Sequence, residues 1–365
     1  MVSRRKVLAG LASLPFASTA LFKAAMSATL SGGTTRLLGT CVRIEQLEQE
    51  PQLADCVLSQ FGSITPEIHL KWNSVENREG QFWFEPVDRL VAFAGKHDLR
   101  LHGHTLLWEQ GTPDWALHAM RRDKDWGLIE RHIERVMSHY RDVIRDWDVV
   151  NEPIDTQNGR DGLRRNTFQK TFGSDYIARA LQAAHHTAPN ARLLLNEYGF
   201  EYDNYIEVDR RAALLKLLEQ LLVAGVPLHG VGIQAHLDLG KGVIPERDVS
   251  RFLQDIADMG LVILITELDV KERDYRATLA ERDMRVSDEV RRYLDIAFAQ
   301  PAVESVTTWG ITDRLSWLQV EPGDRVDQNR FGPAAPNRGL PFDSGLQPKA
   351  MHAALLDALQ ARSLG

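Results

Sequence analysis

A chain of 365 residues can hold two average domains or one large α/β barrel, and its hydrophobic content of 44% is ample for a sizeable core. The formal net charge of −7 argues against nucleic acid or an anionic membrane as a partner, because no basic cluster along the chain overrides it. A neutral polymer is compatible with this charge.

The N-terminal residues 1–28 have the pattern of an export signal rather than of a folded segment. Arg4, Arg5 and Lys6 precede an apolar stretch at residues 7–22, which small residues extend to Ala28. The adjacent arginines resemble a twin-arginine signal, which predicts export to the periplasm or the extracellular space. A Sec-type signal and an uncleaved anchor are the alternatives. No other stretch is long and apolar enough to cross a bilayer, so no membrane span is expected in the mature chain.

Beyond this signal, short apolar runs alternate with amphipathic segments of helical periodicity. Strands are expected at residues 37–41, 63–67, 100–106, 146–151, 192–196, 230–234, 262–267 and 305–309. Helices are expected between and after them, at residues 86–97, 128–140, 175–187, 208–224, 249–259, 287–300 and 348–360. Such alternation predicts parallel strands joined by crossover helices. Eight strands in one uninterrupted series predict a single-domain (β/α)8 TIM barrel over residues 29–365, with a long loop at residues 322–340.

The two cysteines are Cys41, in a strand-like run, and Cys56, in a helical pattern. An exported protein could pair them, but both patterns favour free thiols in the core. The spacing of cysteines and histidines does not match a metal site, and neither a metal nor a cofactor is expected.

Polar side chains gather where the expected strands end. The carboxyl ends of barrel strands meet at one face, and this face carries the active site in barrel enzymes. A lone histidine such as His236 is more often a satisfied core residue, but its place in this ring makes it a candidate partner of the catalytic acids. The ring consists of Glu67, Lys71, His102, His104, Asn151, Glu152, Asn196, Glu197, Gln234, His236, Glu267, Asp269 and Trp309.

Two glutamates stand out because each closes an apolar run. Glu152 ends residues 147–152 (WDVVNE), and Glu267 ends residues 261–267 (LVILITE). Such runs are typical of buried parallel strands, which would deliver both carboxylates to the barrel mouth. Two carboxylates that face each other there are the minimal apparatus for cleaving a glycosidic bond. The alternative is that each glutamate caps a helix or pairs with an arginine.

Around these glutamates the sequence resembles glycoside hydrolase family 10, the retaining endo-β-1,4-xylanases. Residues 148–152 (DVVNE) resemble the acid/base motif of that family, and residues 265–269 (ITELD) resemble its nucleophile motif. Asn-Glu-Pro alone is a weak signal, since a whole clan of barrel glycosidases uses it, whereas the ordered set is specific. The rest of the set is residues 65–67 (TPE), 71–72 (KW), 102–108 (HGHTLLW), 196–198 (NEY), 232–237 (GIQAHL), 308–313 (TWGITD) and Trp317.

The resemblance implies a role for each matching position. Glu152 would be the acid/base and Glu267 the nucleophile, while Asn151 would bind the 2-hydroxyl of the sugar at subsite −1 and His236 would orient Glu267. Glu67 would reach toward subsite −2. Core packing is the alternative for the tryptophans, whose faces would otherwise contact sugar rings. Subsite −1 would be lined by Lys71, His104, Trp108, Gln234, Trp309 and Trp317.

Three positions depart from the family pattern. Ile68 stands where the family has asparagine, and Glu109 and Gly111 replace a histidine and a glutamine beyond Trp108. Those positions normally help to bind sugar in subsites −1 and −2, so the departures concern the substrate more than the chemistry.

The prediction is therefore a monomeric, retaining, endo-acting hydrolase of xylan. Another β-linked polysaccharide, such as a bacterial exopolysaccharide, a glucan or a mannan, is the alternative substrate. The non-enzyme alternative is a carbohydrate-binding barrel without turnover. The intact Asn151, Glu152, His236 and Glu267 argue against it, because a pure binder has no need of an acid that faces a nucleophile.

Overall fold

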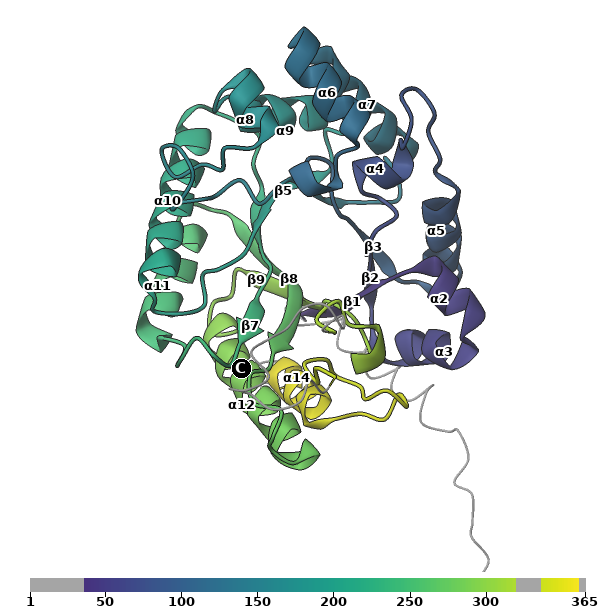
Figure 1. Cartoon of the computed structure of the whole chain (residues 1–365), viewed down its shortest axis with the longest axis vertical. Helices are drawn as coiled ribbons and strands as arrows, with labels where there is room; N and C mark the ends of the chain where they lie inside the picture. The colour runs from purple at the N-terminus through teal and green to yellow at the C-terminus, as the bar shows by residue number, and fades with distance from the viewer. Residues whose placement is uncertain (1–35, 320–335, 361–365) are drawn as a thin grey trace, which may run out of the picture.

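The computed structural model describes residues 36–319 and 336–360, in which eight parallel strands close into a barrel (Figure 1). Neighbouring strands pair in the order β6-β5-β4-β3-β2-β1-β9-β8, and pairing of β6 with β8 closes the ring. The (β/α)8 barrel prediction is confirmed. The expected signal at residues 1–28 and most of the expected loop at 322–340 lie outside the described residues. The strands are β1 (Leu37–Val42), β2 (Ser63–Pro66), β3 (Arg100–Gly103), β4 (Asp146–Asn151), β5 (Arg192–Glu197), β6 (Gly230–Ile233), β8 (Val262–Lys271) and β9 (Val303–Thr308).

Helices form a ring around the strands, and the colours in Figure 1 follow the chain once around it. Short 3-10 turns, η2 (Glu109–Gly111) and η3 (Asp313–Leu315), follow β3 and β9. The helices are α2 (Ile44–Gln49), α3 (Pro51–Gln60), α4 (Trp72–Val75), α5 (Glu85–His97), α6 (Asp114–Asp123), α7 (Gly127–His139), α8 (Thr167–Phe172), α9 (Tyr176–Thr187), α10 (Tyr205–Val223), α11 (Glu246–Asp258), α12 (Leu279–Ala297) and α14 (Ala350–Gln360).

The core lies both inside the barrel and between the strands and the helices. Leu193, Leu194 and Leu195 in β5 are all fully buried, as expected for a parallel strand that is covered on both faces. The helices are amphipathic, and α11 buries Val249, Phe252, Leu253 and Ile256 on one side. These burial patterns explain why apolar periodicity alone reveals the alternation of strands and helices.

Three predicted boundaries are wrong for identifiable reasons. The strand expected at 100–106 ends at Gly103, and the N–H groups of Leu106 and Leu107 turn to carbonyls of β4 instead. The strand expected to stop at Glu267 continues to Lys271, because β7 (His236–Asp238) pairs in parallel with its end. The helix expected at residues 287–300 is α12, which begins earlier, at Leu279. A capping box between Thr278 and Glu281 sets this start.

The cysteines lie where the sequence places them. Cys41 is buried in β1, Cys56 is partly buried in α3, and both are free thiols. Within residues 36–319 and 336–360, no helix has the length and apolar character that a membrane crossing requires.

Candidate active site

The proposed nucleophile Glu267 lies in the second half of β8, four residues before the strand ends at Lys271, with its side chain buried. The pairing of β8 with β9 shifts between Ile265 and Leu268, and such irregularities redirect side chains beside active sites. One carboxylate oxygen of Glu267 accepts a hydrogen bond from Asn196 Nδ2 at 2.7 Å, and the other lies 3.3 Å from His236 Nε2. Burial by itself would raise the pKa of Glu267, but the hydrogen bond with His236 and the charge of His104 outweigh burial, and the pKa is lowered. Glu267 is therefore held as a carboxylate.

His236 is held by two carboxylates and a tryptophan. It lies opposite Asp269 in the β7–β8 pairing, and its Nδ1 is 2.8 Å from Asp269 Oδ1. The other oxygen of Asp269 accepts a hydrogen bond from Trp317 Nε1 at 2.6 Å. Burial would lower the pKa of His236, but Asp269 and Glu267 together raise the pKa well above its ordinary value. A charged imidazole thus separates Glu267 from Asp269.

Glu152 follows the last residue of β4 and has a left-handed backbone, with φ of 57°. Its N–H donates to the carbonyl of Asn196 at 2.8 Å, and its Oε1 lies 3.4 Å from Asn151 Nδ2. Its carboxyl is largely buried, with 13% of the side chain exposed, and Arg164 Nη2 lies 3.9 Å from Oε2. The backbone turn takes the side chain out of the strand alternation and leaves the carboxyl at the barrel mouth.

Asn196, at the end of β5, connects the two glutamates. Its Nδ2 donates both to Glu267 and to Asn151 Oδ1, the latter at 2.8 Å, and its Oδ1 accepts from Thr266 at 2.7 Å. Gln234 Nε2 also approaches Asn151 Oδ1, at 3.4 Å. A continuous hydrogen-bonded chain therefore joins Glu152, Asn151, Asn196 and Glu267 in one site.

Gly232 makes room for this chain. A Cβ at Gly232 would lie only 2.2 Å from Asn196 Oδ1, so any larger residue would displace the bridging side chain. The sequence places Asn196 in the ring of strand-end residues, but it gives no signal that one amide contacts both halves of the site.

Lys71 and Trp108 form the floor beside Glu267. The Lys71 ammonium lies 4.6 Å from the centre of the Trp108 ring. Burial lowers the pKa of Lys71, and the carboxylates of Glu267 and Glu67 oppose this shift. A Cβ at Gly111 would lie 3.0 Å from Trp108 and 3.4 Å from Lys71, so the absence of a side chain at Gly111 permits this packing.

Two histidines of the β3 segment share one buried carboxylate in β4. His102 Nε2 and His104 Nδ1 each lie 2.9 Å from the same oxygen of Asp148. Burial would raise the pKa of Asp148, but the two histidines lower it to about 2. His104 in turn packs edge-on against Trp309, with 5.1 Å between ring centres. The sequence names His104 for subsite −1 but not Asp148, whose contacts lie beneath the site.

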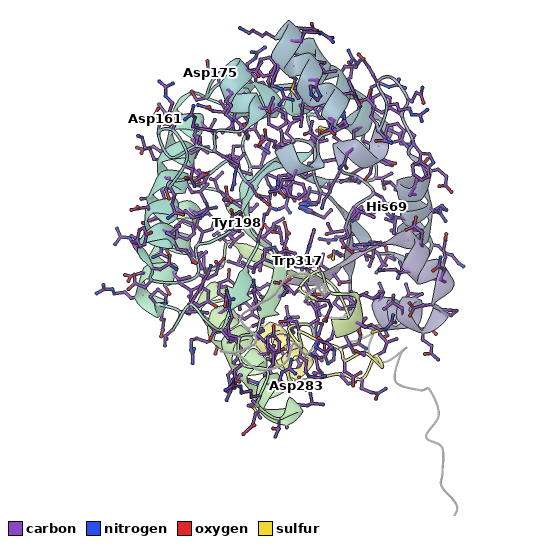
Figure 2. The ribbon with its side chains drawn as sticks, in the orientation of Figure 1. His69, Asp161, Asp175, Tyr198, Asp283 and Trp317 are labelled. Carbon is purple, nitrogen blue, oxygen red and sulfur yellow. The ribbon has the colours of Figure 1, made fainter. Side chains whose placement is uncertain are left out.

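The tryptophans take different positions. Trp309 is 7% exposed and packs on His104, whereas Trp317 is 55% exposed and packs edge-on to His236. Trp108 is half-buried beside Lys71. Figure 2 shows Trp317 and Tyr198 inside the ring of helices, while Asp161 and Asp175 lie on its outside. Trp317 is therefore available for contact with a ligand at the mouth, and Trp309 is mainly packed.

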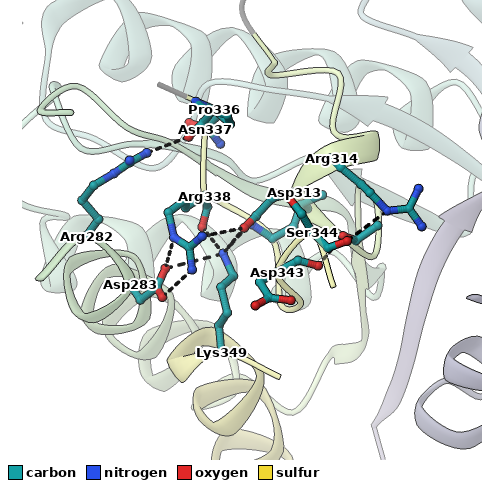
Figure 3. A network of polar contacts seen from close by, with 12 residues as sticks. Arg282, Asp283, Asp313, Arg314, Pro336, Asn337, Arg338, Asp343, Ser344 and Lys349 are labelled. Carbon is teal, nitrogen blue, oxygen red and sulfur yellow. Dashed lines mark hydrogen bonds and ion pairs between the residues drawn. The ribbon is translucent and has the colours of Figure 1, made fainter. Parts of the chain in front are cut away.

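A buried ion-pair network anchors the loop that carries Trp317 (Figure 3). Asp313, in η3, accepts a hydrogen bond from the Lys349 ammonium at 2.9 Å and from the N–H of Leu340 at 3.2 Å. Arg338 forms two hydrogen bonds of 2.7 Å with Asp283 of α12. These contacts bind the β9 loop to residues 336–349 and α12, far away in the sequence.

Glu67, which the resemblance places toward subsite −2, is paired with Arg43 in the structure. Both of its carboxylate oxygens accept hydrogen bonds from the Arg43 guanidinium, at 2.9 and 2.5 Å. Residue spacing does not connect Arg43 with the site, because the contact joins two different strand ends. Glu67 faces the mouth as half of an ion pair.

Glu109, one of the three departures from the family pattern, is hydrogen-bonded to α8. Its Oε1 accepts hydrogen bonds from the N–H and the hydroxyl of Thr167, at 2.6 and 2.7 Å, in the first turn of α8. An acid at a helix N-terminus satisfies a free backbone N–H. Glu109 therefore links η2 to α8, and Ile68, half-buried after β2, adds no polar group.

Within the described residues, no group of three or more histidine, cysteine or acidic side chains could hold a metal ion. The site that the structure assembles consists of two carboxyls, a charged imidazole, a lysine, amides and tryptophans. At the mouth of a (β/α)8 barrel, this arrangement defines a glycoside hydrolase.

Comparison with known proteins assigns this glycoside hydrolase to a family. The family model described as glycosyl hydrolase family 10 matches residues 27–358, and the chain belongs to this family. The chain is 30% identical over 305 residues to endo-1,4-beta-xylanase B of Thermotoga neapolitana. This match covers 83% of the chain and 82% of that protein.

Solved structures agree with this assignment. Native xylanase 10B from Thermotoga maritima is 27% identical, with a TM-score of 0.78, and the match covers 91% of this chain and 97% of that one. Xylanase 10B from Thermotoga petrophila RKU-1, solved in complex with xylobiose, is 26% identical, with a TM-score of 0.77 over 90% of this chain and 95% of that one. The resemblance to family 10 is thus confirmed at the level of family and fold.

Proposed function

We propose that this glycoside hydrolase cleaves internal β-1,4 linkages of xylan by double displacement, with retention of configuration. The observation that carries the proposal is the hydrogen-bonded chain that joins Glu152 to Glu267 through Asn151 and Asn196. A retaining mechanism needs two carboxyls roughly 5–5.5 Å apart, one to attack and one to protonate.

In the first step, a Glu267 carboxylate oxygen attacks C1 of the sugar at subsite −1. The bond from C1 to the leaving oxygen breaks, and that oxygen takes the proton of Glu152. The lowered pKa of Glu267 supports its role as the attacking group, because a nucleophile must be ionised. The charged His236 and the amide of Asn196 hold the carboxylate in place.

In the second step, water attacks C1 of the glycosyl ester and gives its proton to Glu152. The bond from C1 to Glu267 breaks, and the sugar leaves with its original β configuration, since C1 has been inverted twice. Asn151 would bind the 2-hydroxyl, and its Oδ1 is oriented by Asn196 and Gln234. Lys71, His104, Trp108, Trp309 and Trp317 would line subsite −1.

Xylan is the proposed substrate because the relatives named above are xylanases and one of them is solved with xylobiose. A second candidate is another β-linked backbone, such as an exopolysaccharide, a glucan or a mannan. It is favoured by Ile68 and Gly111, which offer no side-chain hydrogen bond, and by Glu67 and Glu109, whose oxygens bind Arg43 and Thr167. The two candidates share one catalytic mechanism.

A panel of polysaccharides decides between these substrates. The purified enzyme is incubated with linear xylan, branched xylan, β-1,4-glucan, β-1,4-mannan and acidic exopolysaccharides, and the products are identified by size and linkage. Early release of mixed xylo-oligosaccharides supports an endo-xylanase. Products from another backbone alone would replace xylan, and binding without any product would favour a carbohydrate-binding barrel.

We further propose that residues 1–28 direct export by the twin-arginine route and that the mature chain is a monomer. The support for export is the arrangement of Arg4 and Arg5 before the apolar stretch at 7–22. Replacement of both arginines by lysine should retain the enzyme in the cytoplasm, as measured by activity in cell fractions. Light scattering of the mature enzyme should give the mass of one chain.

A further inference from the structure

The backbone beyond Glu152 has lost its strand partners. The ladder of β4 ends at Asn151, and Pro153 has no N–H to donate. Glu152 itself has a positive φ, a conformation that is unfavourable for a residue with a side chain and persists only where the surroundings hold it. The N–H groups of Glu152 and Ile154 donate to Asn196 and Glu197, so the remaining question is what holds the carbonyls of this segment.

Arg164 holds these carbonyls from further along the same loop. Its Nε donates to the carbonyl of Glu152 at 2.8 Å, and its Nη2 donates to the carbonyl of Ile154 at 3.2 Å. The Arg164 N–H donates to the carbonyl of Pro153 at 2.7 Å. One residue thus binds three successive carbonyls, each just beyond the end of the strand.

Arg164 is itself held by the neighbouring strand end. Its Nη2 donates to the Tyr198 hydroxyl at 3.0 Å. The Arg210 guanidinium lies over the same tyrosine, 4.2 Å from the centre of its ring. Arg210 donates to the carbonyl of Ile154 at 2.9 Å and to Glu197 at 2.6 Å. Two guanidinium groups therefore fasten the loop after β4 to the loop after β5.

We propose that Arg164 is a positioning residue for Glu152, which fixes the backbone of the acid/base through paired hydrogen bonds to the Glu152 and Ile154 carbonyls. This inference rests on the proposed function, in which Glu152 protonates the leaving oxygen. Displacement of a catalytic group by about 1 Å can cost about a hundredfold in rate. Arg164 is partly exposed, with 25% of its side chain accessible, and it lies 3.9 Å from Glu152 Oε2, whereas the buried Arg210 lies 2.6 Å from the fully buried Glu197. Replacement of Arg164 therefore disturbs the pairing of buried acids less than replacement of Arg210 would.

The first test varies the leaving group. Aryl β-xylobiosides that range from dinitrophenyl to phenyl are hydrolysed by wild type, Arg164→Ala, Arg164→Lys and Arg165→Ala. Protonation of the leaving group matters only when the leaving group is poor. Arg164→Ala should therefore lose about ten- to a hundredfold in kcat/KM, which reports formation of the glycosyl enzyme, on the phenyl glycoside and less than about threefold on the dinitrophenyl glycoside. Arg165, the exposed next residue, is the matched control and should change neither.

The conservative variant separates geometry from charge. A lysine at position 164 keeps the charge but lacks the planar fork, so Arg164→Lys should recover only part of the loss on the phenyl glycoside. Full recovery would assign the effect to charge and overturn the positioning role. An equal loss on all leaving groups would overturn it as well, because a general structural defect does not follow leaving-group acidity.

A crystal structure of Arg164→Ala decides the question even if the proposed function fails. If the wild type hydrolyses none of the aryl glycosides, the role of Glu152 as acid/base is rejected. The proposal that Arg164 positions the Glu152 backbone can still be tested by the crystal structure. The inference then requires the Glu152 and Ile154 carbonyls to shift when Arg164 is truncated. An unmoved Glu152 in that structure would overturn it.

Discussion

The two halves of the barrel mouth differ in where their polar side chains point. On the side of β4 to β8, Glu152, Asn196, His236 and Glu267 hydrogen-bond within one cluster, either to one another or through Asn151. On the side of β1 to β3, Glu67 is bound by Arg43, Glu109 is bound by the start of α8, and Ile68 is apolar. We call these the catalytic half and the recognition half.

The difference between the two halves indicates which part of the site is constrained by cleavage of the glycosidic bond. Bond cleavage needs two carboxyls at fixed separation, and each side chain in the catalytic half supports one of them. Sugar recognition can be rebuilt from other contacts, because specificity depends on which hydroxyls meet fixed polar groups. The following changes probe the comparison, beginning with the catalytic half.

Glu267→Ala should have the largest effect. Removal of the nucleophile abolishes the covalent step, and we expect kcat on the best substrate to fall about 10⁴-fold or more. Initial rates at saturating substrate measure this loss, and a cooperative thermal unfolding transition shows that the variant is folded. A loss below about tenfold would remove Glu267 from the role of nucleophile.

Glu152→Ala should depend on the substrate. On a polysaccharide or a phenyl glycoside, the rate should fall about 10²–10⁴-fold, whereas a dinitrophenyl glycoside needs little protonation to leave and should form the glycosyl enzyme at a nearly normal rate. Pre-steady-state release of dinitrophenol measures that step by itself. The same loss on both glycosides would give Glu152 a different role.

His236→Asn should alter how stability depends on pH. The pKa of His236 is raised in the folded protein, so its contribution to the free energy of unfolding is complete below its ordinary value of 6.5 and is lost as the pH rises through the raised value. The pKa of Glu267 is lowered, partly by His236, so that contribution is present above 4.5 and is lost as the pH falls.

The stability difference between wild type and His236→Asn should therefore be largest between about pH 4.5 and 6.5 and should shrink on both sides. Urea unfolding at pH 3, 6 and 10 measures it, and replacement of the exposed His186 by asparagine is the control. A difference that grows toward pH 10 would mean that His236 is not held as a cation between Glu267 and Asp269.

The smallest effects are expected in the recognition half. Ile68→Asn should add one hydrogen bond to a sugar at subsite −2, worth about 0.5–1.5 kcal/mol, and raise kcat/KM on xylotriose about two- to tenfold. Gly111→Gln should not help, since its Cβ would lie 3.0 Å from Trp108 and disturb the floor. Val223→Asn, on the outer surface of α10, controls for a general effect of asparagine. A loss of activity in Ile68→Asn would show that this half is already built for xylan in another way.

The sequence predicted the barrel because its buried strands and amphipathic helices have distinct periodicities. It also located both glutamates, because each follows an apolar run that must end at the mouth. It missed β7, a strand of three residues, and therefore the pairing that sets His236 opposite Asp269.

The contacts that escaped the sequence are made by long side chains across different loops. The pairing of Arg43 with Glu67 spans two strand ends, Arg164 folds back onto the carbonyl of Glu152, and Glu109 turns to Thr167. Each depends on a rotamer choice among several polar partners, which residue spacing does not encode. The recognition half is therefore less predictable than the catalytic half.

The most direct test of the double displacement is the configuration of the first product. Xylohexaose is hydrolysed in deuterated water, and proton NMR follows the anomeric signals before mutarotation equilibrates them. Attack by Glu267 followed by water predicts that the β-anomer appears first and the α-anomer only later. Early appearance of the α-anomer would mean a single inversion and would contradict the roles assigned to Glu152 and Glu267.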